Sequence, residues 1–203
     1  MKKMLRDPSL WILLASNVFI LVHYLEIPGS INTVILLFWI QSALIGVFNA
    51  LDIMTATHIV ENSYTLKGIF SNVRINAGLF FLLHYGIFHA VYLLFIFTLV
   101  INRSEVDWNF VITSTWFLAI TSAVGLVQSK IRNRNMAAHI GNMFMMPYLR
   151  IIPMHMVILI PAFLHVSAPL VFIIFKIMAD TAMHVLYQRS IYKPIREKAT
   201  VNS

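Results

Sequence analysis

The chain has 203 residues, of which 59% are hydrophobic and only 11% are charged, and its formal net charge is +7. Soluble domains usually contain about a quarter charged residues, so this composition excludes a protein that water solvates on all sides. The absence of cysteine excludes disulfides, thiolate metal ligands and thiol nucleophiles.

Six apolar stretches could each cross a bilayer, which takes about 20 residues. We expect helices over residues 9–26, 31–54, 77–101, 109–128, 150–167 and 168–190. No internal repeat, low-complexity tract or soluble domain interrupts them. The sequence therefore predicts a single all-α domain over residues 1–203, a polytopic transmembrane bundle of six helices.

Lysine and arginine gather on one side of these six helices. The amino terminus, the second and fourth loops and the carboxyl terminus are basic, whereas the other three loops share one basic residue, Arg103. Basic loops of membrane proteins face the cytoplasm. We therefore expect both ends in the cytoplasm, in a multi-pass protein of a prokaryotic cytoplasmic membrane. This placement explains the positive charge without a nucleic-acid partner.

Polar side chains interrupt four of the apolar stretches, where lipid makes them costly and thus indicative of function. They are Gln41, Asn49 and Asp52 in the second helix, His84, Tyr85 and His89 in the third, His155 in the fifth, and Lys176, Asp180 and His184 in the sixth. At about 100° per residue, those of the second, third and sixth helices share one face each. We expect these faces to point into the bundle.

Several of the same residues also lie at similar depths in the membrane. At about 1.5 Å per residue, His84, His155 and His184 lie roughly 5–11 Å inside the cytoplasmic ends of their helices. His89 and Asp180 lie deeper, roughly 10–18 Å in. The sequence thus predicts one cavity on the cytoplasmic side, lined from four helices.

Imidazole together with carboxylate is a ligand set for zinc or iron. Asp180 and His184 are four residues apart, so both can reach one ion from the same helix face. The predicted metal ligands are His84, His89, His155, His184 and Asp180. Gln41, Asn49, Tyr85 and Lys176 would orient them, and Asp180 and Asp52 are the candidate catalytic carboxylates.

Three functions fit this arrangement. A metal with an open position would support a hydrolase or an oxidase acting on a lipid or other membrane-associated amphiphile. Haem b is the alternative cofactor, held by His84 or His89 with His155 or His184. A proton-coupled transporter, with Lys176 and Asp180 in a proton relay, is the third. The same lysine and aspartate, at i and i+4, also fit a purely structural pair.

Three runs carry a resemblance to a known family: Phe38–Ser42, Phe80–His89, and Pro147–Ile151 with Met154 and His155. On these runs the chain resembles an uncharacterised family of small prokaryotic polytopic membrane proteins, over most of its length. The resemblance implies no activity, because that family has none assigned. The resemblance is consistent with these three segments forming the predicted site.

Overall fold

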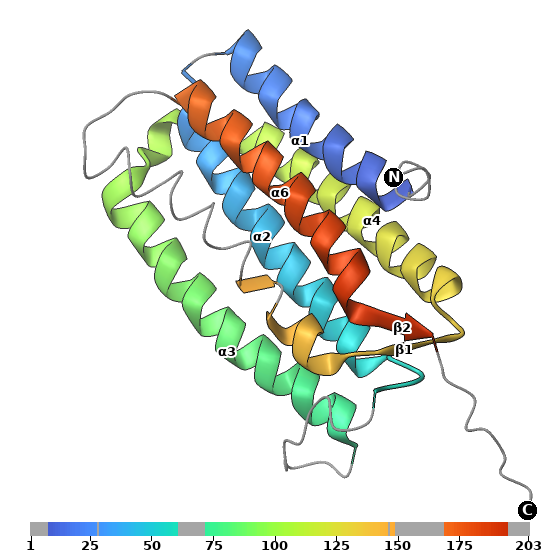
Figure 1. Ribbon diagram of the computed structural model, residues 1–203. Coiled ribbons are helices and arrows are strands. Elements are labelled where there is room, and N and C mark those ends of the chain that lie inside the picture. Colours follow the sequence, from blue (N-terminus) through green and yellow to red (C-terminus); the bar gives the residue numbers. More distant parts are fainter. Residues whose placement is uncertain (1–7, 28, 61–71, 146, 149–168, 195–203) are drawn as a thin grey trace, which may run out of the picture.

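The computed structural model describes residues 8–27, 29–60, 72–145, 147–148 and 169–194 (Figure 1). Its elements are α1 (Pro8–Glu26), α2 (Ile31–Met54), α3 (Val73–Phe95) with a π-helical extension (Ile96–Val100), a 3-10 turn (Arg103–Glu105), α4 (Trp108–Arg132), β1 (Met136–Ala138), α6 (Pro169–Ile191) and β2 (Tyr192–Pro194). Residues 140–145 and 147–148 are also helical. The described chain is a helical bundle, as the sequence predicts. The predicted helix 150–167 lies outside the described residues.

Local capping sets two helix starts. The Asn72 side chain accepts a hydrogen bond from the backbone of Arg74 at 3.0 Å, so α3 begins four residues before the predicted residue 77. Asp107 accepts one from the backbone of Phe110, also at 3.0 Å, at the start of α4. At its other end α4 continues to Arg132, because basic residues in a last turn stabilise the carboxyl end of a helix.

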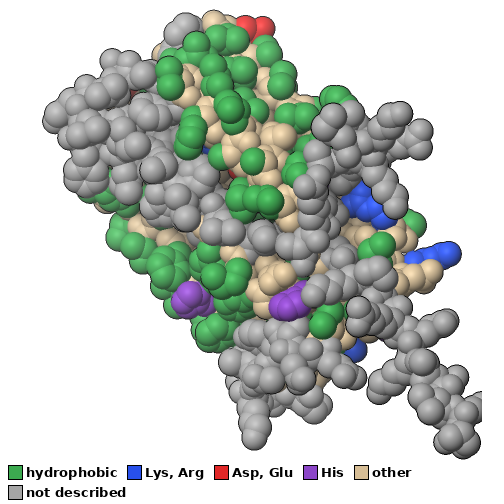
Figure 2. Space-filling view, viewed as in Figure 1, with side chains coloured by type: hydrophobic (Ala, Val, Ile, Leu, Met, Phe, Trp, Pro, Cys, Tyr) green, Lys and Arg blue, Asp and Glu red, His purple; other side chains and the backbone are tan. Residues whose placement is uncertain are grey.

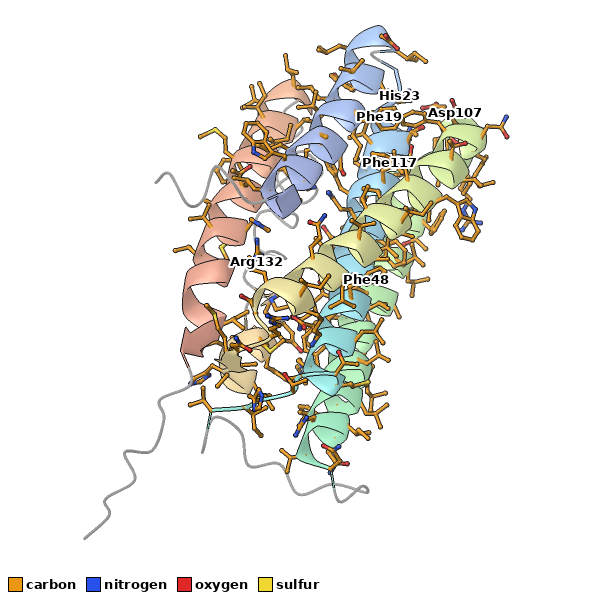
Figure 3. All side chains as sticks on the ribbon, turned by 90° about the vertical axis from the view of Figure 1, so that its right-hand side faces the viewer. Phe19, His23, Phe48, Asp107, Phe117 and Arg132 are labelled. Carbon is orange, nitrogen blue, oxygen red and sulfur yellow. The ribbon has the colours of Figure 1, made fainter. Side chains whose placement is uncertain are left out.

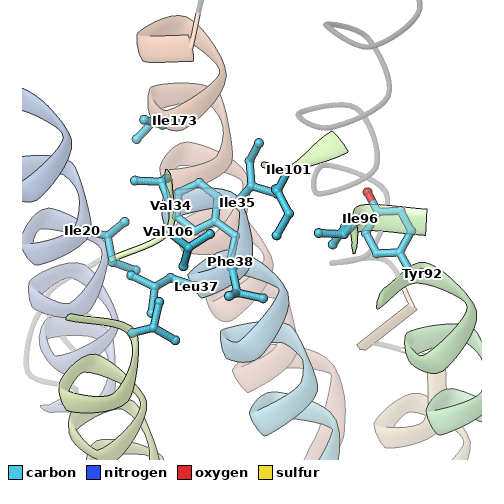
Figure 4. Close-up of a cluster of buried hydrophobic side chains, with 12 residues drawn as sticks. Ile20, Val34, Ile35, Leu37, Phe38, Tyr92, Ile96, Ile101, Val106 and Ile173 are labelled. Carbon is cyan, nitrogen blue, oxygen red and sulfur yellow. The ribbon is translucent and has the colours of Figure 1, made fainter. Parts of the chain in front are cut away.

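Helix α2 is the centre of the bundle. It packs against α1, α3 and α4, and its buried side chains occur on all sides of the helix. A helix that is apolar all round is one that other helices surround. The cluster drawn in Figure 4 includes Val34, Leu37 and Phe38 of α2, with Ile20 of α1 and Ile173 of α6.

Aromatic rings fill the contact between α1 and α4. The ring of Phe19 stacks on Phe110 with centroids 5.2 Å apart, and also contacts Phe117 at 5.8 Å. The buried ring of His23 lies flat on Phe110, with centroids 3.6 Å apart. Figure 3 shows Phe19, His23 and Phe117 where these two helices face one another.

Three helices of the described chain are long and apolar enough to cross a membrane: Ile31–Met54, Val73–Val100 and Trp108–Arg132. Two of them carry apolar stripes on their outer faces. On α3 the stripe includes Leu83, Ile87, Val91 and Leu94; on α4 it includes Ile112, Trp116, Ile120 and Val124. Figure 2 shows hydrophobic side chains spread over much of one face of the molecule. Apolar areas this extended are unusual on water-exposed surfaces and suit lipid.

A small sheet ties helix ends together, which the sequence did not predict. Strands β1 and β2 are antiparallel, with Ala137 opposite Lys193, and Ile59 adds a parallel bridge to Ala138. The backbone of Ala138 donates to the carbonyl of His58 at 2.8 Å. Strands of three residues are too short to show an alternating pattern, so only the folded chain reveals them.

The contact between α2 and α3 depends on a glycine. A Cβ on Gly46 would overlap the ring of Tyr85, which packs directly on the α2 backbone. We expect Gly46→Ala to lower the free energy of unfolding by about 1–3 kcal/mol, because the ring must move. Denaturant titration in detergent micelles measures this difference.

Gly125→Ala on α4 is the matched control. Nothing lies within 4 Å of a Cβ at that position. The control should gain stability, because alanine favours a helix by about 1 kcal/mol over glycine. Equal stability of the two variants would contradict the packing described here.

Candidate functional site

Four polar side chains meet inside the bundle, each near the middle of its helix. Asn17 comes from α1, Gln41 from α2, and Lys176 and Asp180 from α6. All four are at most 5% exposed. We refer to Asn17, Gln41, Lys176 and Asp180 as the polar centre.

The four side chains of the polar centre bond to one another, with the charges on Lys176 and Asp180. Lys176 Nζ lies 2.7 Å from Asp180 Oδ2. The same ammonium donates to Asn17 Oδ1 at 3.1 Å and to Gln41 Oε1. Gln41 Nε2 donates to Asn17 Oδ1 at 3.3 Å, and Asn17 Nδ2 lies 3.5 Å from Asp180 Oδ2. The face of the Phe38 ring, 4.2 Å from Nζ, adds a cation–π contact.

Burial makes these bonds obligatory. A lone charge in the low-dielectric interior costs several kcal/mol, and a pair recovers that cost only with good geometry and further hydrogen bonds. The ammonium has three N–H donors, and Asp180, Asn17 and Gln41 supply three acceptors. The centre as a whole has no net charge, so a proton or ion that enters it must be balanced there.

A second polar network joins α2 to α3. His89 Nδ1 lies 3.1 Å from the carbonyl oxygen of Tyr85, so this nitrogen carries a proton and donates. In the neutral ring Nε2 then accepts from the hydroxyl of Ser42, also 3.1 Å away. Tyr85 donates from its hydroxyl to the Ser42 carbonyl at 3.1 Å. A metal ion on His89 would have to displace one of these bonds.

Of the other predicted histidine ligands, the structure describes His84 and His184. His84 is exposed, and its Nδ1 is hydrogen-bonded to the hydroxyl of Tyr148. His184 is half-buried on α6. His155 lies outside the described residues. Within the described ranges no three His, Asp or Glu side chains could hold one metal ion, so the predicted histidine cluster is not supported there.

The rotation of α3 explains why His84 is separated. Its buried face carries Tyr85, His89 and Tyr92, which are four and three residues apart. His84 is one residue before Tyr85, so it is turned by about 100° from that face. The sequence placed His84 and His89 on one broad polar face, but the packing of α3 divides that face into an inner and an outer part.

Asp52, a predicted catalytic carboxylate, and Asn49, a predicted orienting residue, bond to groups other than the predicted metal ligands. Asp52 pairs with Lys130 of α4, with Oδ1 2.6 Å from Nζ, and its own carbonyl accepts from Nζ at 2.9 Å. Asn49 donates to the carbonyl of Met143 at 3.0 Å. Both residues are buried near the end of α2, where they join α2 to α4 and to the segment after β1.

Sequence reasoning missed three residues of these networks: Asn17, Ser42 and Lys130. For Asn17 there was a signal, because an amide in the middle of an apolar stretch needs a hydrogen-bond partner. Lys130 was assigned to a basic loop, since the predicted helix ended at residue 128. Ser42 carried no comparable signal, because serine is common at contacts between membrane helices.

The polar centre limits the chemistry available to Asp180. A divalent ion on its carboxylate would lie beside the ammonium of Lys176, which repels it. Metal binding there would need a neutral lysine. A proton passed from Lys176 to Asp180, by contrast, leaves the net charge of the pair unchanged.

We expect Lys176→Met to destabilise the protein by about 3–5 kcal/mol, because it leaves a buried carboxylate without its counter-charge. The double variant Lys176→Met/Asp180→Asn removes both charges and should recover much of this loss. Denaturant titration of the three proteins in micelles measures both differences.

Lys130→Met is the control for a loss of one lysine. That side chain is 31% exposed, so solvent reaches the Lys130–Asp52 pair and the effect should be smaller. If the double variant is no more stable than Lys176→Met, the pairing of the two charges does not explain why Lys176 and Asp180 lie together.

Comparison with known proteins adds the family. The model of a family of unknown function, DUF6498, matches residues 1–197. No curated protein and no solved structure matches the chain. The resemblance to an uncharacterised family is confirmed by this match, which covers nearly all of the sequence. The chain belongs to the DUF6498 family.

Proposed function

We propose that this chain is a multi-pass membrane protein that couples proton movement to the transport of a small solute. Asp180 is the group that gains and loses the proton, and Lys176 is its counter-charge. Asn17 and Gln41 hold the ammonium whenever the carboxylate is protonated. The observation that carries this proposal is a fully buried ion pair, bonded to amides from two further helices.

Membrane insertion is supported by the apolar surface and by the distribution of charge. Three helices have the length and composition to cross a bilayer, and α3 and α4 expose apolar stripes. We infer six spans with both ends in the cytoplasm of a prokaryote, because the basic residues gather in alternate loops. Lipid bilayer is then the principal partner of the chain.

Proton coupling is supported by the charge balance of the centre. Ionisable residues at the middle of a span mark ion and proton pathways. Protonation of Asp180 would leave the cation of Lys176 buried and unbalanced, which costs several kcal/mol unless an ion moves with it. The arrangement therefore favours entry of the proton together with a negatively charged solute.

Asp180→Asn should abolish proton movement, because the amide keeps the size of the side chain but has no proton to exchange. The purified protein is reconstituted in liposomes that contain a pH-sensitive dye, and the initial rate after a pH jump is compared with that of protein-free vesicles. To test coupling, a candidate solute is added either inside or outside the liposomes.

Glu26→Gln is the control for loss of a carboxylate, since Glu26 is exposed at the end of α1. It should retain the wild-type rate. If Asp180→Asn folds and moves protons at that rate as well, the polar centre is a structural pair and the proposed function is wrong.

A metal centre is the second proposal, because imidazole and carboxylate side chains together are a ligand set for zinc or iron. Elemental analysis of protein purified without chelator should then find zinc or iron, and His155→Ala should lower its content. A Soret absorption band would instead identify haem b. Transport that survives chelation, from protein without metal or haem, would reject both cofactors.

A further inference from the structure

A cavity opens where α2 and α4 end, away from the polar centre. Its volume is about 150 Å³, equal to the space that about five water molecules occupy in the liquid. The polar side chains in its wall include His58, Lys130, Asn133 and Arg134, and the remaining lining residues are Thr57, Met136 and two alanines. None of the lining residues is acidic, and the two cationic side chains among them are Lys130 and Arg134.

The positive groups of this pocket differ in what they already bind. Lys130 is committed to Asp52, with its ammonium on both the carboxylate and the backbone carbonyl. Arg134 is exposed and makes no ion pair or hydrogen bond within the described part of the chain. The guanidinium of Arg134 thus has its donors available, in a planar fork that fits the oxygens of a phosphate.

The ends of two helices would ordinarily repel an anion here. Both α2 and α4 end beside the pocket, and the carboxyl end of a helix carries partial negative charge. Cations already bind carbonyls at this point: Lys130 holds the carbonyl of Asp52, and Arg74 donates to that of Ala56. Their positive charge offsets the helix ends, so the positive charge of Arg134 remains for a ligand.

The walls of the pocket are held in place by backbone bonds. Ala138 donates to the carbonyl of His58 at 2.8 Å, and Val60 donates to that of Ala138 at 3.0 Å. These bonds join the segment after α2 to β1, and β1 is joined to β2. A binding site supported in this way needs little reorganisation when a ligand enters.

We propose that this pocket binds a phosphate group, with Arg134 as the principal ligand and His58 and Lys130 beside it. The phosphate can belong to a free phosphorylated solute or to a phospholipid headgroup, because the pocket lies at the ends of the apolar helices. This inference is independent of proton coupling at Asp180, and either can fail alone.

Two arms of one experiment test the proposal and separate the sources. In the first, inorganic phosphate is titrated into wild-type protein in detergent, with chloride at equal ionic strength as the reference, and binding is measured by calorimetry. In the second, thermal unfolding is compared in nanodiscs of phosphatidylcholine with and without phosphatidylglycerol.

Arg134→Gln should weaken phosphate binding about tenfold, the loss expected for one charge-assisted bond. Arg134→Lys should weaken it less, because the charge remains without the fork. Arg132→Gln is the matched control: Arg132, labelled in Figure 3, ends the same helix but is absent from the pocket wall. The control should bind phosphate as the wild type does.

The pattern of results identifies the ligand or rejects it. Phosphate binding that depends on Arg134, without an effect of phosphatidylglycerol, assigns the pocket to a soluble phosphate. Stabilisation by phosphatidylglycerol that Arg134→Gln removes assigns it to a headgroup. No binding in either arm, or equal losses in Arg134→Gln and Arg132→Gln, overturns the proposal. Because Arg134 is exposed and unbonded, circular dichroism should show both Arg134 variants folded.

Discussion

The burial of Lys176 beside Asp180 constrains the bundle more than any other contact of the described chain. Two charges can stay in a low-dielectric interior only if each lies against the other and the remaining donors find acceptors. The acceptors are Asn17 and Gln41, so α1, α2 and α6 must keep fixed rotations and heights relative to one another. Phe38 contacts the same ammonium and also belongs to the apolar core, which links polar and apolar packing.

Helix α2 can serve two polar networks because helices pack against more than one of its sides. Gln41 and Ser42 are neighbours in sequence and point about 100° apart. Gln41 reaches the polar centre, whereas Ser42 reaches Tyr85 and His89 of α3. In lipid such side chains would stay unsatisfied, so their position on a central helix is what makes them tolerable. The two networks are thus separated by the thickness of one helix, and α2 is where any coupling between them would pass.

The end of the bundle that carries the small sheet has a different chemistry. There the ion pair of Asp52 with Lys130 is partly open to solvent, and basic side chains bind the carbonyls at the end of α2. Backbone bonds between β1, β2 and the segment after α2 join helices that are distant in sequence. A buried ion pair and a solvent-accessible pocket with basic side chains therefore occupy different levels of one molecule.

The amino-acid sequence by itself determined the helical class, the apolar stretches and the resemblance to the family. It also determined that Lys176 and Asp180 share one helix face, because the spacing of residues along a helix fixes the angle between their side chains. Only the tertiary structure decided that Asn17 completes their bonds, that His84 is turned outward while His89 is buried, and that short strands join the helix ends. The rotation of one helix against its neighbours depends on packing over its whole surface, and no spacing within a single helix encodes it.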